Sequence, residues 1–174
     1  MLPTLTYECP DFLMESGGQP LLKNLPKTLD GFVKVKVRHR RTTDSFTENF
    51  NSAFTDERSR LLQRSVFAHG PSSFVSSTDS NLEPFYIFPV DGFRYMYNPS
   101  AASTSEYKST FEKLITNVGD SAPELFQKLL KYDYVFDKLA EGISGGSEII
   151  FYGIPYYFAL RKSIIEDYES FYRS

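Results

Sequence analysis

Two periodicities in the first third of the chain predict a strand followed by a helix. Residues 32–38 alternate, with valines on one face and basic side chains on the other, which is the period of a half-buried strand. Beyond them, phenylalanines recur at helical spacing. Asp44 or Ser45 is positioned to cap this helix, whose apolar stripe is expected to reach Leu61.

Short strands and a turn are expected in the middle of the chain. The apolar runs that predict the strands are at 64–69, 84–90 and 93–97. The last two runs flank Asp91-Gly92, a pair that favours the tight turn of a hairpin. The pattern therefore predicts that these two strands pair with each other.

The second half of the chain carries clear helix signals. Ser103 and Glu106, and again Ser121 and Glu124, have the spacing of a capping box, in which each side chain binds the free backbone amide of the other residue. Apolar residues at helical spacing follow both pairs, and a further short helix is expected to end near Gly142. The remaining residues predict strands at 147–152 and 156–160 and a closing helix over 161–173.

The first thirty residues differ from the rest. Four prolines and a glycine pair predict that residues 1–30 form an irregular N-terminal arm. Residues 31–174 contain no repeat, low-complexity tract or linker, so they are expected to form one compact domain of short, mostly antiparallel strands with flanking helices. The predicted fold class is α+β.

Composition narrows the class of protein. The 174 residues include 22 Asp and Glu against 19 Lys and Arg, and the resulting net charge of −3 excludes a generally basic nucleic-acid coat. The hydrophobic share of 41% is that of a globular chain and not of a disordered one. Aromatic residues are abundant, with 16 Phe and 12 Tyr, and these residues dominate both cores and interfaces.

Several other classes are not expected. No run approaches the roughly 20 apolar residues of a membrane-spanning helix, and the N-terminus lacks the pattern of a secretory signal. Cys9 is the only cysteine, which excludes a disulfide within the chain and favours a reducing compartment. With one cysteine and two histidines, no zinc site of the usual kind is expected.

The alternating strand is also a concentration of positive charge. Five of the 19 basic residues lie within 34–41, with no acid among them. Such a segment suits a phosphate group of a nucleotide or of nucleic acid. The alternative is the solvated face of an edge strand, where lysines block pairing with another sheet. His39 shares the valine face, and we expect it to point inward with its hydrogen bonds satisfied.

Glu148 is a candidate for chemistry. It follows the flexible Gly145-Gly146 pair and directly precedes a strongly apolar strand, so its carboxylate is expected to point into a cleft. A carboxylate there can stabilise developing positive charge or accept a proton. The alternative is an ion pair with a nearby Arg or Lys.

Hydroxyl groups and tyrosines supply further candidates. The run at 72–78 is rich in serine and has the composition either of a ribose-binding or phosphate-binding segment or of a solvated loop. Tyr86, Tyr95 and Tyr97 are candidates to stack on a base or a nicotinamide ring, and the alternative is that they belong to the core.

Five blocks occur in a characteristic order. They are Arg38-x-x-Arg41-x-x-Asp44-Ser45, Arg64-Ser65-Val-Phe67, Tyr86-Ile-Phe-Pro-Val-Asp-Gly-Phe93, Tyr97-Asn-Pro99 and Gly145-Gly-Ser-Glu148-Ile-Ile. This order resembles a group of small uncharacterised proteins from bacteriophages and some bacteria, over residues 33 to 160. The layout is in turn similar to the ADP-ribosyltransferase superfamily, whose members cleave NAD and transfer ADP-ribose to a target.

The resemblance implies roles for particular residues. Glu148 matches the catalytic glutamate, which holds the nicotinamide ribose and stabilises the oxocarbenium-like transition state. Arg38 matches the basic residue of the first core strand, which contacts NAD, and Arg41 and Arg64 are supporting phosphate contacts. Ser65 competes with the hydroxyl groups of 72–78 for the middle motif of the family.

The resemblance also implies a substrate and a setting. NAD is the expected substrate, and Tyr86, Tyr95 or Tyr97 is expected to stack on its nicotinamide. The target is expected to be a host macromolecule in the host cytoplasm. Arginine-modifying members carry Gln or Glu two positions before the catalytic glutamate, where this chain has Gly146, so an arginine target is not expected.

Two other functions are compatible with the sequence. One is a non-enzymatic interaction protein of a phage, either an inhibitor of a host or defence protein or a minor virion component, for which the aromatic residues and the arm would supply the interface. The other is a nucleic-acid binder or nuclease that uses the basic strand at 34–41.

Overall fold

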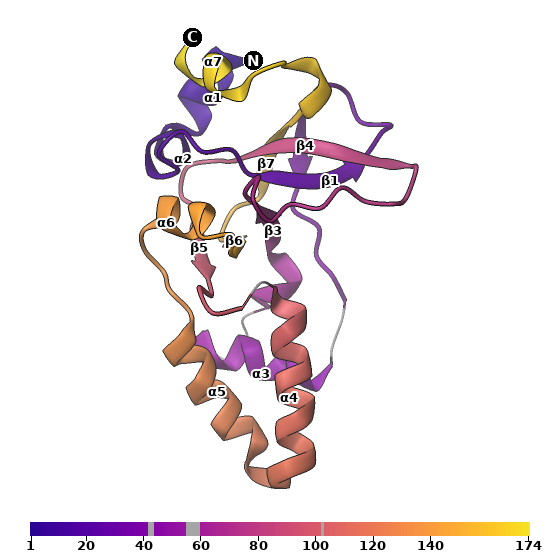
Figure 1. Cartoon of the computed structure of the whole chain (residues 1–174), viewed down its shortest axis with the longest axis vertical. Coiled ribbons are helices and arrows are strands. Elements are labelled where there is room, and N and C mark those ends of the chain that lie inside the picture. Colours follow the sequence, from indigo (N-terminus) through magenta and orange to yellow (C-terminus); the bar gives the residue numbers. More distant parts are fainter. Residues whose placement is uncertain (42–43, 55–59, 102) are drawn as a thin grey trace.

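The computed structural model describes residues 1–41, 44–54, 60–101 and 103–174. Within these residues seven strands form one antiparallel sheet, which occupies the middle of the molecule (Figure 1). Their order across the sheet is β2 (Phe32–Lys36), β7 (Tyr156–Arg161), β4 (Leu82–Pro89), β1 (Leu22–Pro26), β3 (Val66–His69), β6 (Glu148–Tyr152) and β5 (Arg94–Tyr97). The predicted α+β class is confirmed.

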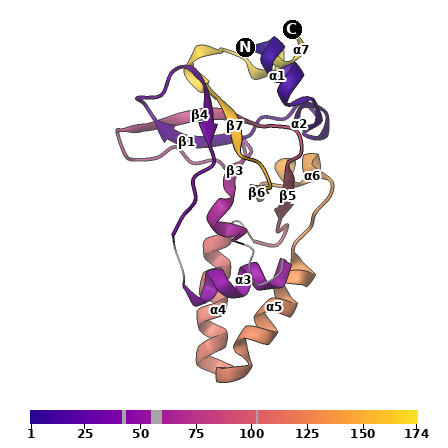
Figure 2. The same cartoon turned by 180° about the vertical axis from the view of Figure 1, so that it is seen from behind.

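Helices gather at the two ends of the molecule (Figures 1 and 2). At one end, beside both chain termini, are α1 (Leu2–Glu8), α2 (Pro10–Glu15) and α7 (Tyr168–Arg173). At the other end are α3 (Ser45–Phe54), α4 (Thr104–Val118) and α5 (Ala122–Asp133). The short α6 (Leu139–Ser144) lies beside β6, and single 3-10 turns occur at η1 (Leu62–Arg64), η2 (Gly119–Ser121) and η3 (Lys162–Ile164).

Aromatic side chains contribute to both of the hydrophobic cores found among the described residues. In the first core, between the sheet and the terminal helices, Phe12 lies edge to face with Phe88 and Phe151, with ring centroids 6.0 and 6.2 Å apart. In the second core, Phe126 packs against Phe46 and Phe111 of neighbouring helices, at 5.7 and 4.7 Å. Burying one such side chain contributes about 2 kcal/mol, so the aromatic content is largely explained by packing.

Strand β6 contributes side chains to both cores. Ile149 and Phe151 belong to the first core, whereas Ile150 belongs to the second. Successive side chains of a strand point to opposite faces, so a strand that is buried on both faces needs an unbroken apolar run. Glu148 is the first residue of this strand. Its side chain lies on the same face as Ile150, so the carboxylate lies on the side of the sheet that faces the second core.

The sheet is nearly divided between β1 and β3. These strands share a single residue pair, Leu22 with His69, whereas β1 pairs with β4 over five residues and β3 with β6 over four. Beyond that pair, the Lys23 ammonium donates a hydrogen bond to the Phe67 carbonyl at 3.1 Å. Where β1 and β3 separate, the Lys23 side chain therefore makes the hydrogen bond that the backbone of a paired strand would otherwise make.

The prediction of an irregular arm over residues 1–30 is wrong. This segment forms α1, α2 and β1, and β1 lies inside the sheet between β4 and β3. Its prolines were misleading because Pro3 and Pro10 occupy the first turns of α1 and α2, where the missing amide hydrogen leaves no bond unmade. The chain therefore has no structural boundary at residue 30.

The predicted hairpin at Asp91-Gly92 is also wrong, although both strands exist. Strand β4 pairs with β1 and β7, and β5 pairs with β6. Gly92 takes the left-handed conformation, with φ of 86°, that the turn requires. The Asp91 amide donates to the Glu8 carbonyl at 2.9 Å, so the turn is held by the N-terminal helices. The dipeptide indicated a turn but not the partner of either strand.

The helix starts agree with the sequence, whereas the predicted caps agree only in part. Asp44 caps α3, since its Oδ1 accepts from the Thr47 amide at 2.7 Å. Ser103 and Ser121 are the N-cap residues of α4 and α5, yet neither side chain makes a cap hydrogen bond. The expected closing helix is reduced to η3 and α7. Of the helix predicted to reach Leu61, residues 55–59 lie outside the described residues, and Leu61 lies in a turn directly before η1.

Candidate functional site

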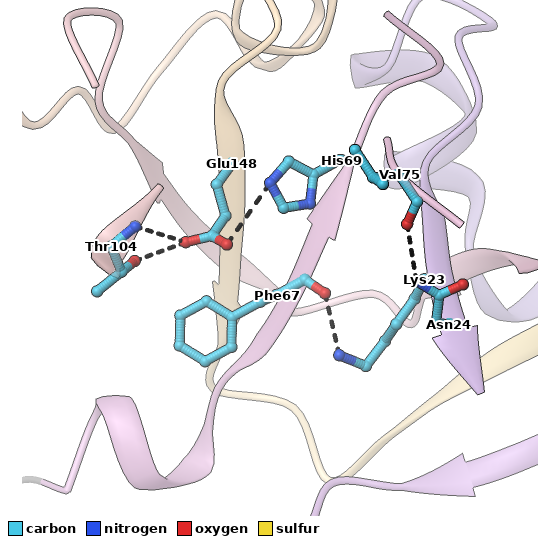
Figure 3. Close-up of polar contacts among 7 residues, drawn as sticks. All are labelled: Lys23, Asn24, Phe67, His69, Val75, Thr104 and Glu148. Atoms are coloured by element: carbon cyan, nitrogen blue, oxygen red, sulfur yellow. Dashed lines mark hydrogen bonds and ion pairs between the residues drawn. The ribbon is translucent and has the colours of Figure 1, made fainter. Parts of the chain in front are cut away.

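Glu148 is held at the N-terminus of α4. Its Oε1 accepts hydrogen bonds from the Thr104 amide at 2.9 Å and from the Thr104 hydroxyl at 2.6 Å (Figure 3). Thr104 is the first residue of α4, so its amide has no partner inside the helix. The carboxylate thus takes the capping role that Ser103 leaves open, and the helix dipole favours its negative charge.

His69 is the second member of the site. It is the last residue of β3 and the direct partner of Glu148 in the β3–β6 ladder, so both side chains project from the same face of the sheet. His69 Nε2 lies 3.6 Å from Glu148 Oε2 (Figure 3). The side chains are 27% and 15% exposed, so the pair is shielded from bulk water and still reachable by a ligand.

A cavity of about 300 Å³ opens beside Glu148, between the sheet and the helices α3 and α4. It is open to solvent and combines charged, hydroxyl and aromatic side chains. Its lining residues are Arg40, Asp44, Phe46, Thr47, Leu62, Gln63, Phe67, Thr104, Ser105, Lys108 and Glu148.

Two segments contribute positively charged side chains to the wall of this cavity, Arg40 after β2 and Lys108 on α4. The Arg40 guanidinium lies over the Phe67 ring, 5.1 Å from its centroid, and the Arg40 amide donates to the Gln63 carbonyl at 2.8 Å. Lys108 pairs with Asp44 at 3.4 Å. The bonds from Thr47, with a smaller contribution from Lys108, lower the pKa of Asp44. The cavity therefore offers a carboxylate, an aromatic face and a guanidinium to one ligand.

The arginines expected to bind NAD are not in this cavity. Arg38 and Arg41 are exposed, and neither lines it. Arg38 follows β2, at the sheet edge that is separated from β6 by four strands. Arg64, at the end of η1, is exposed as well. The basic segment does reach the site, but through Arg40.

The expected hydroxyl and tyrosine contacts are core residues. Ser65 is buried, and its hydroxyl donates to the Leu61 carbonyl at 2.5 Å. Tyr86 is buried against Tyr168, with ring centroids 4.7 Å apart. The hydroxyl groups of Tyr95 and Tyr97 bond the backbone at Leu139 and Lys138, beside α6. None of the four lines the Glu148 cavity, where Phe46 and Phe67 provide the aromatic surface.

The outer part of the basic strand is an ordinary sheet edge. Strand β2 is an edge strand, and Lys34 lies over the Tyr156 ring, 4.2 Å from its centroid. His39 is exposed and contacts Arg60 at 3.3 Å, so the expectation of an inward-facing histidine is wrong. Strand β2 ends at Lys36, and the alternation that placed His39 on the valine face ends with it.

Sequence reasoning missed the companions of Glu148. They come from three segments that only the folded chain brings together: Phe67 and His69 from β3, Thr104 from the start of α4, and Arg40 from the segment after β2. One signal was available: His69 closes an apolar strand and Glu148 opens another, which is the arrangement that two antiparallel strands place side by side.

Comparisons with known proteins identify no relative. No protein-family model, curated protein or solved structure matches the chain. Among the described residues, no helix has the length and apolar character needed to span a bilayer. The same residues contain no group of three or more His, Cys, Asp or Glu side chains arranged to hold a metal ion.

Proposed function

We propose that the protein is an ADP-ribosyltransferase-like enzyme that binds NAD beside Glu148 and transfers ADP-ribose to a host macromolecule. The observation that carries the proposal is the Glu148 carboxylate, fixed by two hydrogen bonds from Thr104 at the wall of an open cavity of about 300 Å³. A volume at the lower end of the range for ligand pockets suits one end of a dinucleotide.

The chemistry follows from the fixed charge. In the proposed reaction the bond between ribose C1′ and the nicotinamide nitrogen breaks, and nicotinamide leaves with the electron pair. The ribose then carries oxocarbenium-like positive charge, which a preorganised carboxylate stabilises without reorganising water. The nucleophile of the target forms the new bond to C1′ and loses its proton, for which His69 is a nearby acceptor.

The contacts to NAD are reassigned from the sequence-based expectation. Arg40 takes the place of Arg38 as the proposed phosphate contact, because Arg40 lines the cavity and Arg38 does not. Phe67, under the Arg40 guanidinium, takes the place of Tyr86 as the proposed stacking surface. Glu148 keeps the catalytic role.

Transfer of label from NAD tests the proposal. The purified chain is incubated with NAD labelled in the adenylate half and with a bacterial lysate, and labelled macromolecules are separated into protein and nucleic acid. We expect label in one fraction with the wild-type chain and with Glu112→Gln, an exposed glutamate on α4, and none with Glu148→Gln. Equal labelling by wild type and Glu148→Gln would rule out the proposed mechanism.

A further inference from the structure

A second cavity adjoins the Glu148 cavity at Phe67. Its volume is about 330 Å³, and its walls come from β1, β3 and the serine-rich loop after β3. Three of its lining residues carry polar groups that bear on its chemistry: Lys23, His69 and Ser73. We call it the Lys23 cavity. Phe67 lines both cavities, so the two adjoin across one side chain.

Lys23 brings a positive charge that has no ionic partner among the described residues. Its ammonium donates to the neutral Phe67 carbonyl at 3.1 Å (Figure 3), and within the described ranges it forms no ion pair with a carboxylate. Burial lowers the pKa of Lys23, the charge of Arg40 lowers it further, and the charge of Glu148 acts in the opposite direction. A partly desolvated ammonium bonded only to a neutral oxygen gains from an anion placed beside it.

Ser73 adds a further hydroxyl donor. Its Oγ is buried and has no hydrogen-bond partner in the part of the chain that the structure describes. The glycine loop that leads to Glu148 lies close to this residue, since a Cβ on Gly146 would be 3.7 Å from the Ser73 Cβ. Buried hydroxyl groups are nearly always hydrogen-bonded, so an unused one in a cavity wall points to a ligand or to water.

Two further polar residues, Asn24 and His69, line the Lys23 cavity. The Asn24 side chain fixes the serine-rich loop by donating to the Val75 carbonyl at 2.9 Å and accepting from the Ser77 amide at 3.2 Å. The Nε2 of His69 lies 3.6 Å from Glu148 Oε2. No Asp or Glu lines the Lys23 cavity within the part of the chain that the structure describes.

We propose that the Lys23 cavity binds a phosphoryl oxyanion. Lys23 supplies the charge-assisted hydrogen bond, and Ser73 supplies a neutral one. The same chemistry is found in inorganic phosphate and in the diphosphate of a nucleotide. The site does not depend on the proposed transferase activity: it rests on the cavity, the unpaired ammonium and the unused hydroxyl.

Calorimetric titration of the full chain with three probes tests the site. The probes are inorganic phosphate, inorganic diphosphate and ADP-ribose. We expect diphosphate to bind to the wild-type chain and Lys23→Met to weaken binding by about tenfold or more, the effect of losing one charge-assisted hydrogen bond. Ser73→Ala is expected to weaken it by a smaller factor. Lys131→Met, at an exposed lysine on α5, is the matched control and should bind as the wild type does.

A second measurement applies if Lys23→Met does not fold. Reductive methylation of the wild-type chain, read at each lysine by mass spectrometry, should be slowed at Lys23 by diphosphate and unchanged at Lys131. Binding of phosphate alone indicates a single phosphoryl group, whereas binding of ADP-ribose alone indicates a nucleotide, and either supports the site. The absence of oxyanion binding at millimolar concentration, or equal binding by the wild type and both cavity variants, overturns it.

The two proposals fail separately. Glu148→Gln is expected to keep oxyanion binding, because Glu148 does not line the Lys23 cavity. The same variant is expected to lose NAD cleavage. Diphosphate binding without NAD cleavage would therefore leave the Lys23 site standing and reject the enzyme.

Discussion

Glu148 and His69 face each other across the β3–β6 ladder, with Oε2 of the glutamate 3.6 Å from Nε2 of the histidine. The same glutamate receives two hydrogen bonds from Thr104 through its other oxygen. One carboxylate thereby links the sheet to the N-terminus of α4. This arrangement fixes the orientation of the carboxylate, which is what electrostatic stabilisation of a transition state requires.

Thr104 is expected to act as a positioning residue. Thr104→Val removes the 2.6 Å hydroxyl bond to Glu148 and retains the amide bond, so the carboxylate becomes less constrained. We expect kcat for NAD cleavage to fall by about tenfold and Thr104→Ser to restore it, as the hydroxyl returns. Steady-state kinetics measure this effect, with KM expected to change little. Thr116→Val, at an exposed threonine of the same helix, should leave kcat unchanged.

Asp44 is expected to stabilise α3 in a pH-dependent way. Asp44→Ala removes the bond to the Thr47 amide and should lower the free energy of unfolding by about 1 kcal/mol at neutral pH. The pKa of Asp44 is lowered from 3.8 in the folded chain, so this stability is present above pH 3.8 and is lost as the pH falls through the lower folded-state value. Urea unfolding at several pH values should show the difference from wild type shrinking in acid. A difference in unfolding free energy that stays constant with pH would contradict this role. Asp137→Ala, at an exposed aspartate, is the control.

Cys9 is expected to be unreactive in the folded chain. It is fully buried, and its thiol lies 3.6 Å from the Phe88 carbonyl. Burial, with smaller contributions from Asp91 and Glu8, raises its pKa from 9.0 to about 12. A chromogenic disulfide reagent at pH 8 should therefore label Cys9 only after urea is added. Rapid labelling of the native chain would contradict the burial.

The neutral Cys9 thiol also favours the folded state below pH 9, and this contribution to stability is lost as the pH rises from 9 to about 12.

The sequence predicted local structure better than partners in space. The helix starts at Ser45, Thr104 and Ala122 follow from capping residues and apolar spacing, which are properties of neighbouring residues. Strand pairing is set by the whole sheet, and the Asp91-Gly92 pair therefore suggested a hairpin that β4 and β5 do not form. The prolines of the first thirty residues predict breaks in the chain, whereas Pro3 and Pro10 lie in the first turns of helices.

The same limit applies to the candidate site. Glu148 was identifiable because a charged residue between a glycine pair and an apolar strand is a local pattern. Its partners are brought to it by tertiary structure: Thr104 by the position of the N-terminus of α4, and His69 by the register of β3 against β6. The resemblance favours Arg38, whereas the path of the chain beyond β2 brings Arg40 to the cavity.

The proposed role of the fixed Glu148 carboxylate is to promote cleavage of NAD, and this step is measured by the release of nicotinamide. Purified wild-type chain, Glu148→Gln and Glu112→Gln are each incubated with NAD, and nicotinamide is quantified by chromatography. We predict release by the wild type and by Glu112→Gln, and a loss of about 100-fold or more in Glu148→Gln, which keeps the shape of the side chain but removes its charge. Nicotinamide release by Glu148→Gln at the wild-type rate, or no release by the folded wild-type chain with or without lysate, would contradict this mechanism.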